Sequence, residues 1–330
     1  MQDVLNLPVA TSALDRDYLM RDNAELFDIL WQNPLTRVLV LHEGKTLLRD
    51  GGASANGVAA SNGIAGSNPE LRLLTVEEVT SAQLRVYLGK TLQPSTYEPE
   101  LTPIVLAVVS ANSAQLVEPD EANWHKLGRS GTGLSDRDAE IYVQALALAN
   151  WHASHVYCPK CGAPTSITKG GWVRTCFGEN YEVFPRTDPA IIVSVTDDQD
   201  RILLGSQGAW GANRWSVLAG FVEPGESLNH AVVREVFEEA GIKVSPPKYL
   251  GSQAWPYPHS LMVGFTAKVD PNHAHLVATP DGEEIVKLRW FSRQDLIAEA
   301  QSLLLPGKSS ISRALIEHWY GGPLPTGEAW

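Results

Sequence analysis

The sequence is poor in cysteine and has no excess of basic residues. Its 330 residues include three cysteines, and 26 basic residues stand against 38 acidic ones, which gives a formal net charge of −12. Proteins that bind polyanions through their own field usually show the opposite balance. A phosphate-bearing ligand of this chain would therefore need a divalent cation to neutralise its charge.

Long apolar runs are also missing. The longest candidates, such as residues 104–109, have the length of a strand and are too short to cross a bilayer. Residues 1–20 lack the basic start and apolar core of a secretory signal. We therefore expect a cytoplasmic protein that does not contact a membrane.

The composition and length are typical of packed domains. Hydrophobic residues make up 44% of the chain, and 330 residues suggest two or three domains. Residues 1–150 are predicted to be β-rich with some helix; strand-like runs occur at 37–41, 46–49, 84–88 and 104–109, the first two as a hairpin, and a helix at 136–151. Residues 51–70 are rich in Gly, Ala, Ser and Asn, which predicts a flexible surface insertion.

Residues 188–330 are predicted to form an α/β domain. Strands are expected at 191–196, 202–204, 262–268 and 287–291, and helices at 228–240 and about 310–319. On the first of these helices Glu235, Glu238 and Glu239 stand at positions i, i+3 and i+4, so three carboxylates crowd one face. A cation among them would relieve the repulsion, and oxygen ligands favour Mg²⁺ or Mn²⁺. The alternative is a solvated acidic face with Arg234 paired to Glu238.

The stretch from Gly220 to Ile242 resembles the Nudix box, GX5EX7REUXEEXGU with U aliphatic, at every specified position. This resemblance implies an α/β/α sandwich with a mixed sheet, in which the box forms a loop, a helix and a loop. It implies that Glu235 and Glu239 bind metal together with the backbone carbonyl of Ala219, and that Glu238 supports them.

In the same resemblance, two further residues of the box have a structural role. Arg234 and Glu226 are expected to hold the loop and the helix in place and not to touch the substrate.

A second informative segment is SQAWPYPHS, residues 252–260. Two prolines stiffen the backbone, and Trp255 and Tyr257 offer flat faces for stacking on a base, although a structural turn would explain an isolated segment of this kind. The segment resembles the SQPWPFPxS motif of the NADH pyrophosphatase branch of the Nudix family, with Ala254 and Tyr257 in place of Pro and Phe. The resemblance implies that a dinucleotide pocket is lined by Gln253, Ala254, Trp255, Pro256, Tyr257, Pro258, His259 and Ser260.

The branch resemblance extends upstream of the box. FPRTDPAII, residues 184–192, is similar to YPRxDPAVI and puts Phe184 where an aromatic ring stacks on the nicotinamide side. Phe221 would supply the opposite face.

It also extends downstream. Glu284 lies six residues before Trp290, where the family has a further metal-binding Glu, and Glu283 is the neighbouring alternative. PGKSSISRALI, residues 306–316, is similar to PGxxSIARxLI and puts Ser312 at a position that contacts the substrate.

The three cysteines, Cys158, Cys161 and Cys176, lie within 19 residues. This clustering indicates a local site and not a disulfide framework. The pattern resembles the zinc ribbon of the same branch, with Glu179 at the fourth ligand position; His152 or His155 would be substitutes. One structural Zn²⁺ and a metal-free ribbon with three reduced thiols both remain open.

Taken together, the resemblance implies three parts: residues 1–150 as a degenerate Nudix-like domain, assigned only by position, 151–187 as a zinc-ribbon-like module, and 188–330 as the catalytic Nudix domain. The implied reaction is metal-dependent hydrolysis of NADH or NAD to (reduced) nicotinamide mononucleotide and AMP, in a homodimer. Removal of NAD caps from the 5′ end of RNA ranks second, because the chain shows no basic stripe.

Two alternatives remain. One is a Nudix hydrolase for ADP-ribose or another nucleoside diphosphate derivative, against which the SQAWPYPHS segment argues. The other is a non-catalytic zinc-ribbon interaction module with an inactive Nudix domain. That second alternative requires a lost carboxylate, and none is missing from the box.

Overall fold

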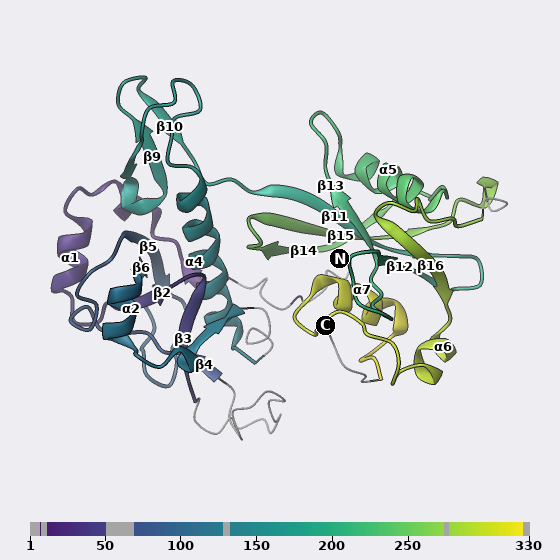
Figure 1. Cartoon of the computed structure of the whole chain (residues 1–330), viewed down its shortest axis with the longest axis horizontal. Coiled ribbons are helices and arrows are strands. Elements are labelled where there is room, and N and C mark those ends of the chain that lie inside the picture. The colour runs from purple at the N-terminus through teal and green to yellow at the C-terminus, as the bar shows by residue number, and fades with distance from the viewer. Residues whose placement is uncertain (1–6, 8–11, 51–68, 128–132, 274–276, 326–330) are drawn as a thin grey trace. The chain divides into compact units, whose positions relative to one another are not determined.

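The computed structural model describes residue 7 and residues 12–50, 69–127, 133–273 and 277–325 (Figure 1). These residues form two compact units. The N-terminal unit comprises the described residues from 12 to 186 and the short segment Trp255–His259. The C-terminal unit comprises Leu7, Thr187–Ala254 and the described residues from Ser260 onward. No helix in the described ranges has both the length and the apolar character needed to cross a membrane.

Up to the end of α4, the described residues of the N-terminal unit form two sheets and three α-helices. One sheet has the order β1-β5-β6-β2 and the other β4-β3-β7. The strands are β1 Leu14–Asp15, β2 Arg37–Leu41, β3 Lys45–Asp50, β4 Pro69–Leu71, β5 Leu84–Thr91, β6 Pro103–Val108 and β7 Trp124–Lys126. The helices are α1 Leu26–Gln32, α2 Ala111–Val117 and α4 Asp136–Ser154.

Two expectations for this unit need correction. The turn at residues 42–45 forms, with an antiparallel bridge between His42 and Lys45, but beyond it β2 and β3 pair with different strands, so no extended hairpin results. Of the expected insertion at 51–70, residues 51–68 lie outside the described residues. Pro69 and Glu70 belong to strand β4, because they pair with Asp50 and Arg49 of β3.

A small three-stranded sheet follows α4. Its order is β10-β9-β8, with β8 Ser166–Thr168, β9 Val173–Cys176 and β10 Tyr181–Val183. Cys176 is the last residue of β9, and Cys158 and Cys161 precede β8. The sheet therefore has the place in the chain that the ribbon module requires.

The C-terminal unit is an α/β/α sandwich around a mixed sheet. The sheet has the order β14-β15-β11-β12-β16, with β13 paired to β11, and β11 runs parallel to β15 while its other neighbours are antiparallel. The strands are β11 Asp188–Thr196, β12 Ile202–Gln207, β13 Leu218–Phe221, β14 Lys248–Trp255, β15 Ser260–Lys268 and β16 Ile285–Phe291. The helices are α5 Leu228–Ala240, α6 Arg293–Ala298 and α7 Ile311–Tyr320.

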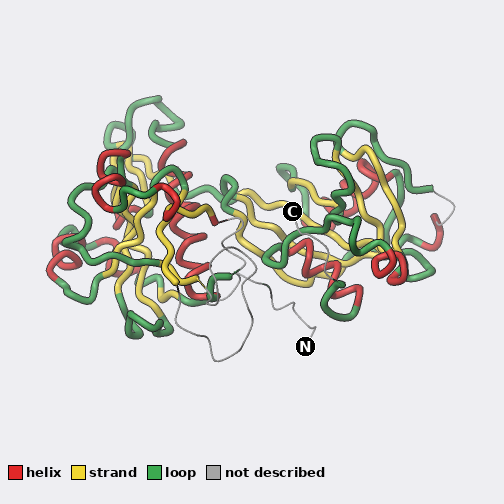
Figure 2. The backbone as a smooth tube through the Cα atoms, turned by 60° about the horizontal axis from the view of Figure 1, so that its bottom comes forward, coloured by secondary structure: helices red, strands yellow, loops and turns green. Residues whose placement is uncertain are grey.

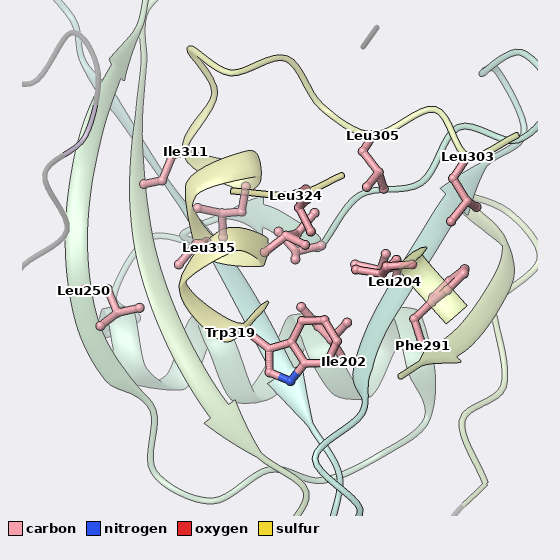
Figure 3. Close-up of a cluster of buried hydrophobic side chains, with 14 of the residues drawn as sticks. Ile202, Leu204, Leu250, Phe291, Leu303, Leu305, Ile311, Leu315, Trp319 and Leu324 are labelled. Carbon is pink, nitrogen blue, oxygen red and sulfur yellow. The ribbon is translucent and has the colours of Figure 1, made fainter. Parts of the chain in front are cut away.

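The alternation of β11 explains the two layers of helices. Ile191 and Val193 pack with the buried face of α5, whereas Ile192 packs in the cluster that α7 completes (Figure 3). Figures 1 and 2 show helices on both sides of this sheet. The expected sandwich is therefore confirmed.

Helix α5 begins and ends where its sequence directs. The Ser227 hydroxyl accepts a hydrogen bond from the backbone N–H of His230, which caps the first turn. Gly241 ends the helix with φ 67°, a left-handed conformation that glycine adopts without a Cβ penalty. The box helix predicted at 228–240 is thus fixed at both ends, and its carboxylates keep a constant position relative to β13.

Candidate active site

Glu235 lies directly against the backbone of β13. A Cβ added to Gly220 would lie 2.0 Å from Cδ of Glu235 and 2.0 Å from its Oε1. Only a residue without a side chain therefore leaves room for this carboxylate. Ala219, the neighbour of Gly220, pairs with Ile192 of β11, so the sheet fixes the backbone next to which Glu235 lies.

Arg234 connects the loop of the box to its helix. Its guanidinium donates to both oxygens of Glu226, at 2.9 and 2.8 Å, and to the backbone carbonyl of Phe221 at 2.9 Å. It also donates to Glu235 at 2.9 Å and Glu238 at 2.8 Å. The hydrogen bond from Arg234 lowers the pKa of Glu226. Arg234 therefore holds three carboxylates and the loop together. The alternative, a solvated acidic face, would have paired Arg234 with Glu238 alone.

Glu239 is a buried carboxylate with an unused oxygen. Its side chain is 3% exposed, and its Oε2 has no hydrogen-bond partner. Burial, followed by the nearby charges of Glu284 and Glu235, raises the pKa of Glu239 to about 8. A buried, unpartnered oxygen among other carboxylates is costly unless a cation binds it, so this donor set fits a divalent metal ion.

Glu284 lies close enough to the same cluster for its charge to act on Glu235 and Glu239. Burial is the main cause of the raised pKa of both Glu235 and Glu239, and the charge of Glu284 raises both further, whereas Glu283 is not among the leading causes. This supports Glu284 over Glu283 as the additional carboxylate. Its Oε1 accepts a hydrogen bond from Nε2 of Gln207 at 3.2 Å.

Asp281 positions the segment that carries Glu284. Its Oδ1 accepts hydrogen bonds from the backbone N–H groups of Glu283, Glu284 and Ile285, at 2.6, 2.9 and 3.1 Å. Neither Asp281 nor Gln207 was singled out from the sequence. Asp commonly forms turns in which its side chain accepts hydrogen bonds from backbone N–H groups two to four residues later, and this pattern would have indicated Asp281. No local signal points to Gln207.

Two of the expected substrate-binding residues are buried and bonded within the C-terminal unit. Gln253 is 2% exposed; its Nε2 donates to the carbonyl of Ser309 at 2.8 Å, and its Oε1 accepts the N–H of Ile311 at 2.9 Å. Ser312 is 4% exposed, and its hydroxyl lies 2.7 Å from that of Ser216. Both residues therefore anchor the start of α7.

The expected aromatic residues are exposed. Phe184, Phe221, Trp255 and Tyr257 have exposed fractions of 60%, 59%, 38% and 45%. The rings of Trp255 and Tyr257 meet edge to face, with their centroids 5.3 Å apart. Exposed aromatic rings of this kind are available to stack on a planar ligand.

The segment Trp255–His259 belongs to the N-terminal unit. Nδ2 of Asn150 in α4 donates to the backbone carbonyls of Pro256 and Pro258, at 2.9 and 3.2 Å. Pro256 is buried, His259 is half-buried with its ring 6.4 Å from that of His155, and the flanking Ala254 and Ser260 belong to strands β14 and β15. Asn150 was missed because nothing local in the sequence connects it to a segment more than 100 residues away.

The three cysteines come together as expected. Their sulfur atoms all lie within 4.8 Å of one another, and Sγ of Cys161 is 3.6 Å from Sγ of Cys176. Within the described ranges they are the only three or more Cys, His, Asp or Glu residues whose ligand atoms lie this close together.

The candidates for a fourth ligand are not part of this group. Glu179 does not join it. Nε2 of His152 lies 2.8 Å from the carbonyl of Gly171, and its Nδ1 lies 3.1 Å from Nη1 of Arg174. Nδ1 of His155 lies 2.9 Å from the hydroxyl of Ser154. The structure thus offers three thiols, and both histidines have other partners.

Comparison with known proteins gives three family matches along the chain. Residues 35–151 match the NADH pyrophosphatase-like rudimentary NUDIX domain, residues 153–184 the NADH pyrophosphatase zinc ribbon domain, and residues 185–315 the NUDIX domain. Among solved structures, a NUDIX hydrolase from Nitrosomonas europaea aligns with a TM-score of 0.39 and 20% identity, over 53% of this chain and 98% of that one.

Two curated relatives are similar over much of the sequence. The NAD-capped RNA hydrolase NudC of Mycobacterium tuberculosis is 37% identical over 268 residues, which cover 76% of this chain and 85% of that protein. The human NAD-capped RNA hydrolase NUDT12 is 35% identical over 200 residues, 56% of this chain and 42% of that protein. With this order of domains and this degree of identity, the chain belongs to the Nudix hydrolase superfamily, in its NADH pyrophosphatase branch.

Proposed function

We propose that this chain hydrolyses the pyrophosphate bond of NADH or NAD and releases (reduced) nicotinamide mononucleotide and AMP. The observation that carries the proposal is the buried Glu239 carboxylate, which has an unpartnered oxygen and is close enough to Glu235 and Glu284 for their charges to raise its pKa. A donor set of this kind suits a divalent cation, and a pyrophosphate needs one in a chain with a net charge of −12. The relatives named as NAD-capped RNA hydrolases support a dinucleotide as the ligand.

Mg²⁺ or Mn²⁺ is the proposed cation, held by Glu235, Glu239, Glu284 and the backbone carbonyl of Ala219. When bound, such a cation neutralises the pyrophosphate and activates a water for attack on phosphorus. Arg234 keeps Glu235 and Glu238 in place while the substrate enters. Glu238 is the exposed one of the three helix carboxylates and supports the other two.

The dinucleotide is proposed to stack on the exposed aromatic residues Phe184, Phe221, Trp255 and Tyr257. Each stacked base contributes on the order of 1–3 kcal/mol. The buried Gln253 and Ser312 would act indirectly, by fixing the start of α7. Asn150 would fix the segment that carries Trp255 and Tyr257.

Further parts of the proposal follow from the family. NAD-capped RNA is the second substrate, as the names of the relatives suggest. We also propose a structural Zn²⁺ on Cys158, Cys161 and Cys176. The chain is further proposed to form a homodimer and to divide into domains near residues 151 and 188. The close approach of three sulfur atoms supports the zinc site.

A substrate panel tests the proposal. The purified chain is given NADH, NAD, ADP-ribose, diadenosine polyphosphates and an NAD-capped oligoribonucleotide with Mg²⁺ or Mn²⁺, and the products are identified by mass. We expect NADH or NAD to yield the mononucleotide and AMP faster than ADP-ribose is cut. Faster turnover of ADP-ribose would contradict the dinucleotide proposal and leave the fold assignment intact.

A further inference from the structure

The C-terminal unit contains a cavity of about 480 Å³ that is separate from the carboxylate cluster. Its walls come from the end of β11, the start of β14, the end of β15 and the last turn of α7, with Arg293 of α6. None of the carboxylates proposed to bind metal is among the lining residues. The cavity is therefore a distinct feature of this unit.

The position of the cavity on the sheet follows from strand alternation. Ser194 and Thr196 of β11 line it, and they share a strand face with Ile192, which packs in the α7 cluster. Figure 3 shows Trp319, another lining residue, at the end of α7 opposite to Ile311. The cavity thus lies on the α7 side of the sheet, whereas the box helix α5 covers the other side.

The charges around the cavity differ in sign from those of the whole chain. Lys248, Lys268, His318 and Arg293 line it, with Asp200 as the acidic member. Arg293 donates to Asp200 at 2.7 Å, so these two charges compensate each other.

The two lysines have no such partner. Among the described residues, neither the Lys248 nor the Lys268 ammonium group has an ion-pair partner within 4.0 Å or a hydrogen-bond partner. Both are exposed, at the start of β14 and the end of the neighbouring β15. Two uncompensated positive charges therefore face one cavity in a chain of net charge −12.

We propose that this cavity binds a phosphate-bearing ligand of about nucleotide size, at a site distinct from the catalytic one. Lysine ammonium groups bind phosphate as point charges, and the hydroxyls of Thr196 and Thr266 in the walls can donate further hydrogen bonds to its oxygens. The volume lies within the range of roughly 300–1,000 Å³ that is usual for small-molecule sites. Because the lysines supply the charge, binding here needs no divalent cation.

Binding without metal separates the two sites in an experiment. The full chain, in a buffer without Mg²⁺ or Mn²⁺, is titrated by calorimetry with inorganic phosphate, with AMP and with a 5′-phosphorylated oligoribonucleotide. We expect AMP to bind to the wild type, and Lys248→Met combined with Lys268→Met to weaken this binding about tenfold or more, because two charges near the phosphate are lost. If inorganic phosphate binds as tightly as AMP, the phosphate group alone is recognised. If the oligoribonucleotide binds more tightly than AMP, the ligand is an RNA chain.

A matched control removes two exposed lysines outside the cavity, Lys126→Met with Lys287→Met, and changes the net charge equally. This variant is expected to bind like the wild type. The proposal is overturned if none of the three probes binds, or if the Lys248/Lys268 variant binds as tightly as the control. Thermal unfolding of both variants checks that the fold is retained.

Discussion

The carboxylate of Glu235 fills the space that a side chain at Gly220 would occupy. A Cβ at this position would lie 2.0 Å from Cδ of Glu235 and 2.0 and 2.3 Å from its two carboxylate oxygens. The first residue of the box and its first helical carboxylate are therefore coupled by shape. This coupling explains why the loop and the helix of the box act as one structural element.

Gly220→Ala should displace Glu235 and reduce turnover of the dinucleotide by about a hundredfold, because small misplacements of a catalytic group are costly. The matched control is Gly211→Ala, where an added Cβ meets only Nε of Arg214 at an ordinary 3.7 Å. Steady-state kinetics and thermal unfolding of both variants provide the measurement. Wild-type turnover in Gly220→Ala would show that Glu235 is not needed in this position.

Glu284→Gln should lower metal-dependent turnover by at least about tenfold, because it removes a charge from the donor set. Glu283→Gln changes the neighbouring carboxylate, which is not among the leading causes of the raised pKa of Glu239, and should remain close to wild type. Titration of activity with Mn²⁺ distinguishes weaker metal binding from slower chemistry. A larger loss in Glu283→Gln than in Glu284→Gln would reverse the assignment.

Acid should destabilise the N-terminal unit through His152. Burial lowers the pKa of His152 to about 4 from the ordinary 6.5, and the Arg174 charge adds to this, so the unfolded chain takes up a proton at a higher pH than the folded one. The free energy of unfolding should therefore fall as the pH drops from 6.5 towards 4. Denaturant unfolding of the wild type and His152→Gln across this range gives the measurement. Identical pH dependence in both proteins would exclude His152 as the cause.

Purified protein should contain about one zinc per chain, because three thiolates are gathered at one point. Cys176→Ser should lose the metal and lower the melting temperature, since a site of this kind is structural. Elemental analysis and calorimetry on both proteins provide the test. Metal-free wild type with an unchanged melting temperature in Cys176→Ser would favour the metal-free ribbon.

The sequence predicted those parts of the site that local chemistry determines. Helix α5 has the predicted bounds because Ser227 and Gly241 cap it within a fixed motif. Burial was less predictable. Gln253 and Ser312 stand at motif positions that suggest substrate contact, yet the polar atoms of Gln253 bond to the start of α7 and the hydroxyl of Ser312 bonds to Ser216.

Long-range partners were not predictable at all. Asn150, which holds the Trp255–His259 segment, and Gln207, which contacts Glu284, approach their partners only through tertiary folding. The split between β2 and β3 after the turn at His42 has the same origin, since pairing with distant strands prevails over the local hairpin signal.

The most direct test of the central claim is NADH hydrolysis by wild type and Glu239→Gln, each with Mg²⁺ or Mn²⁺ and with EDTA. The buried carboxylate with its unpartnered oxygen is proposed to be part of the metal site. The account predicts reduced nicotinamide mononucleotide and AMP from the wild type with metal only, and no turnover by a folded Glu239→Gln. Turnover by Glu239→Gln at the wild-type rate, or by the wild type in EDTA, would contradict it.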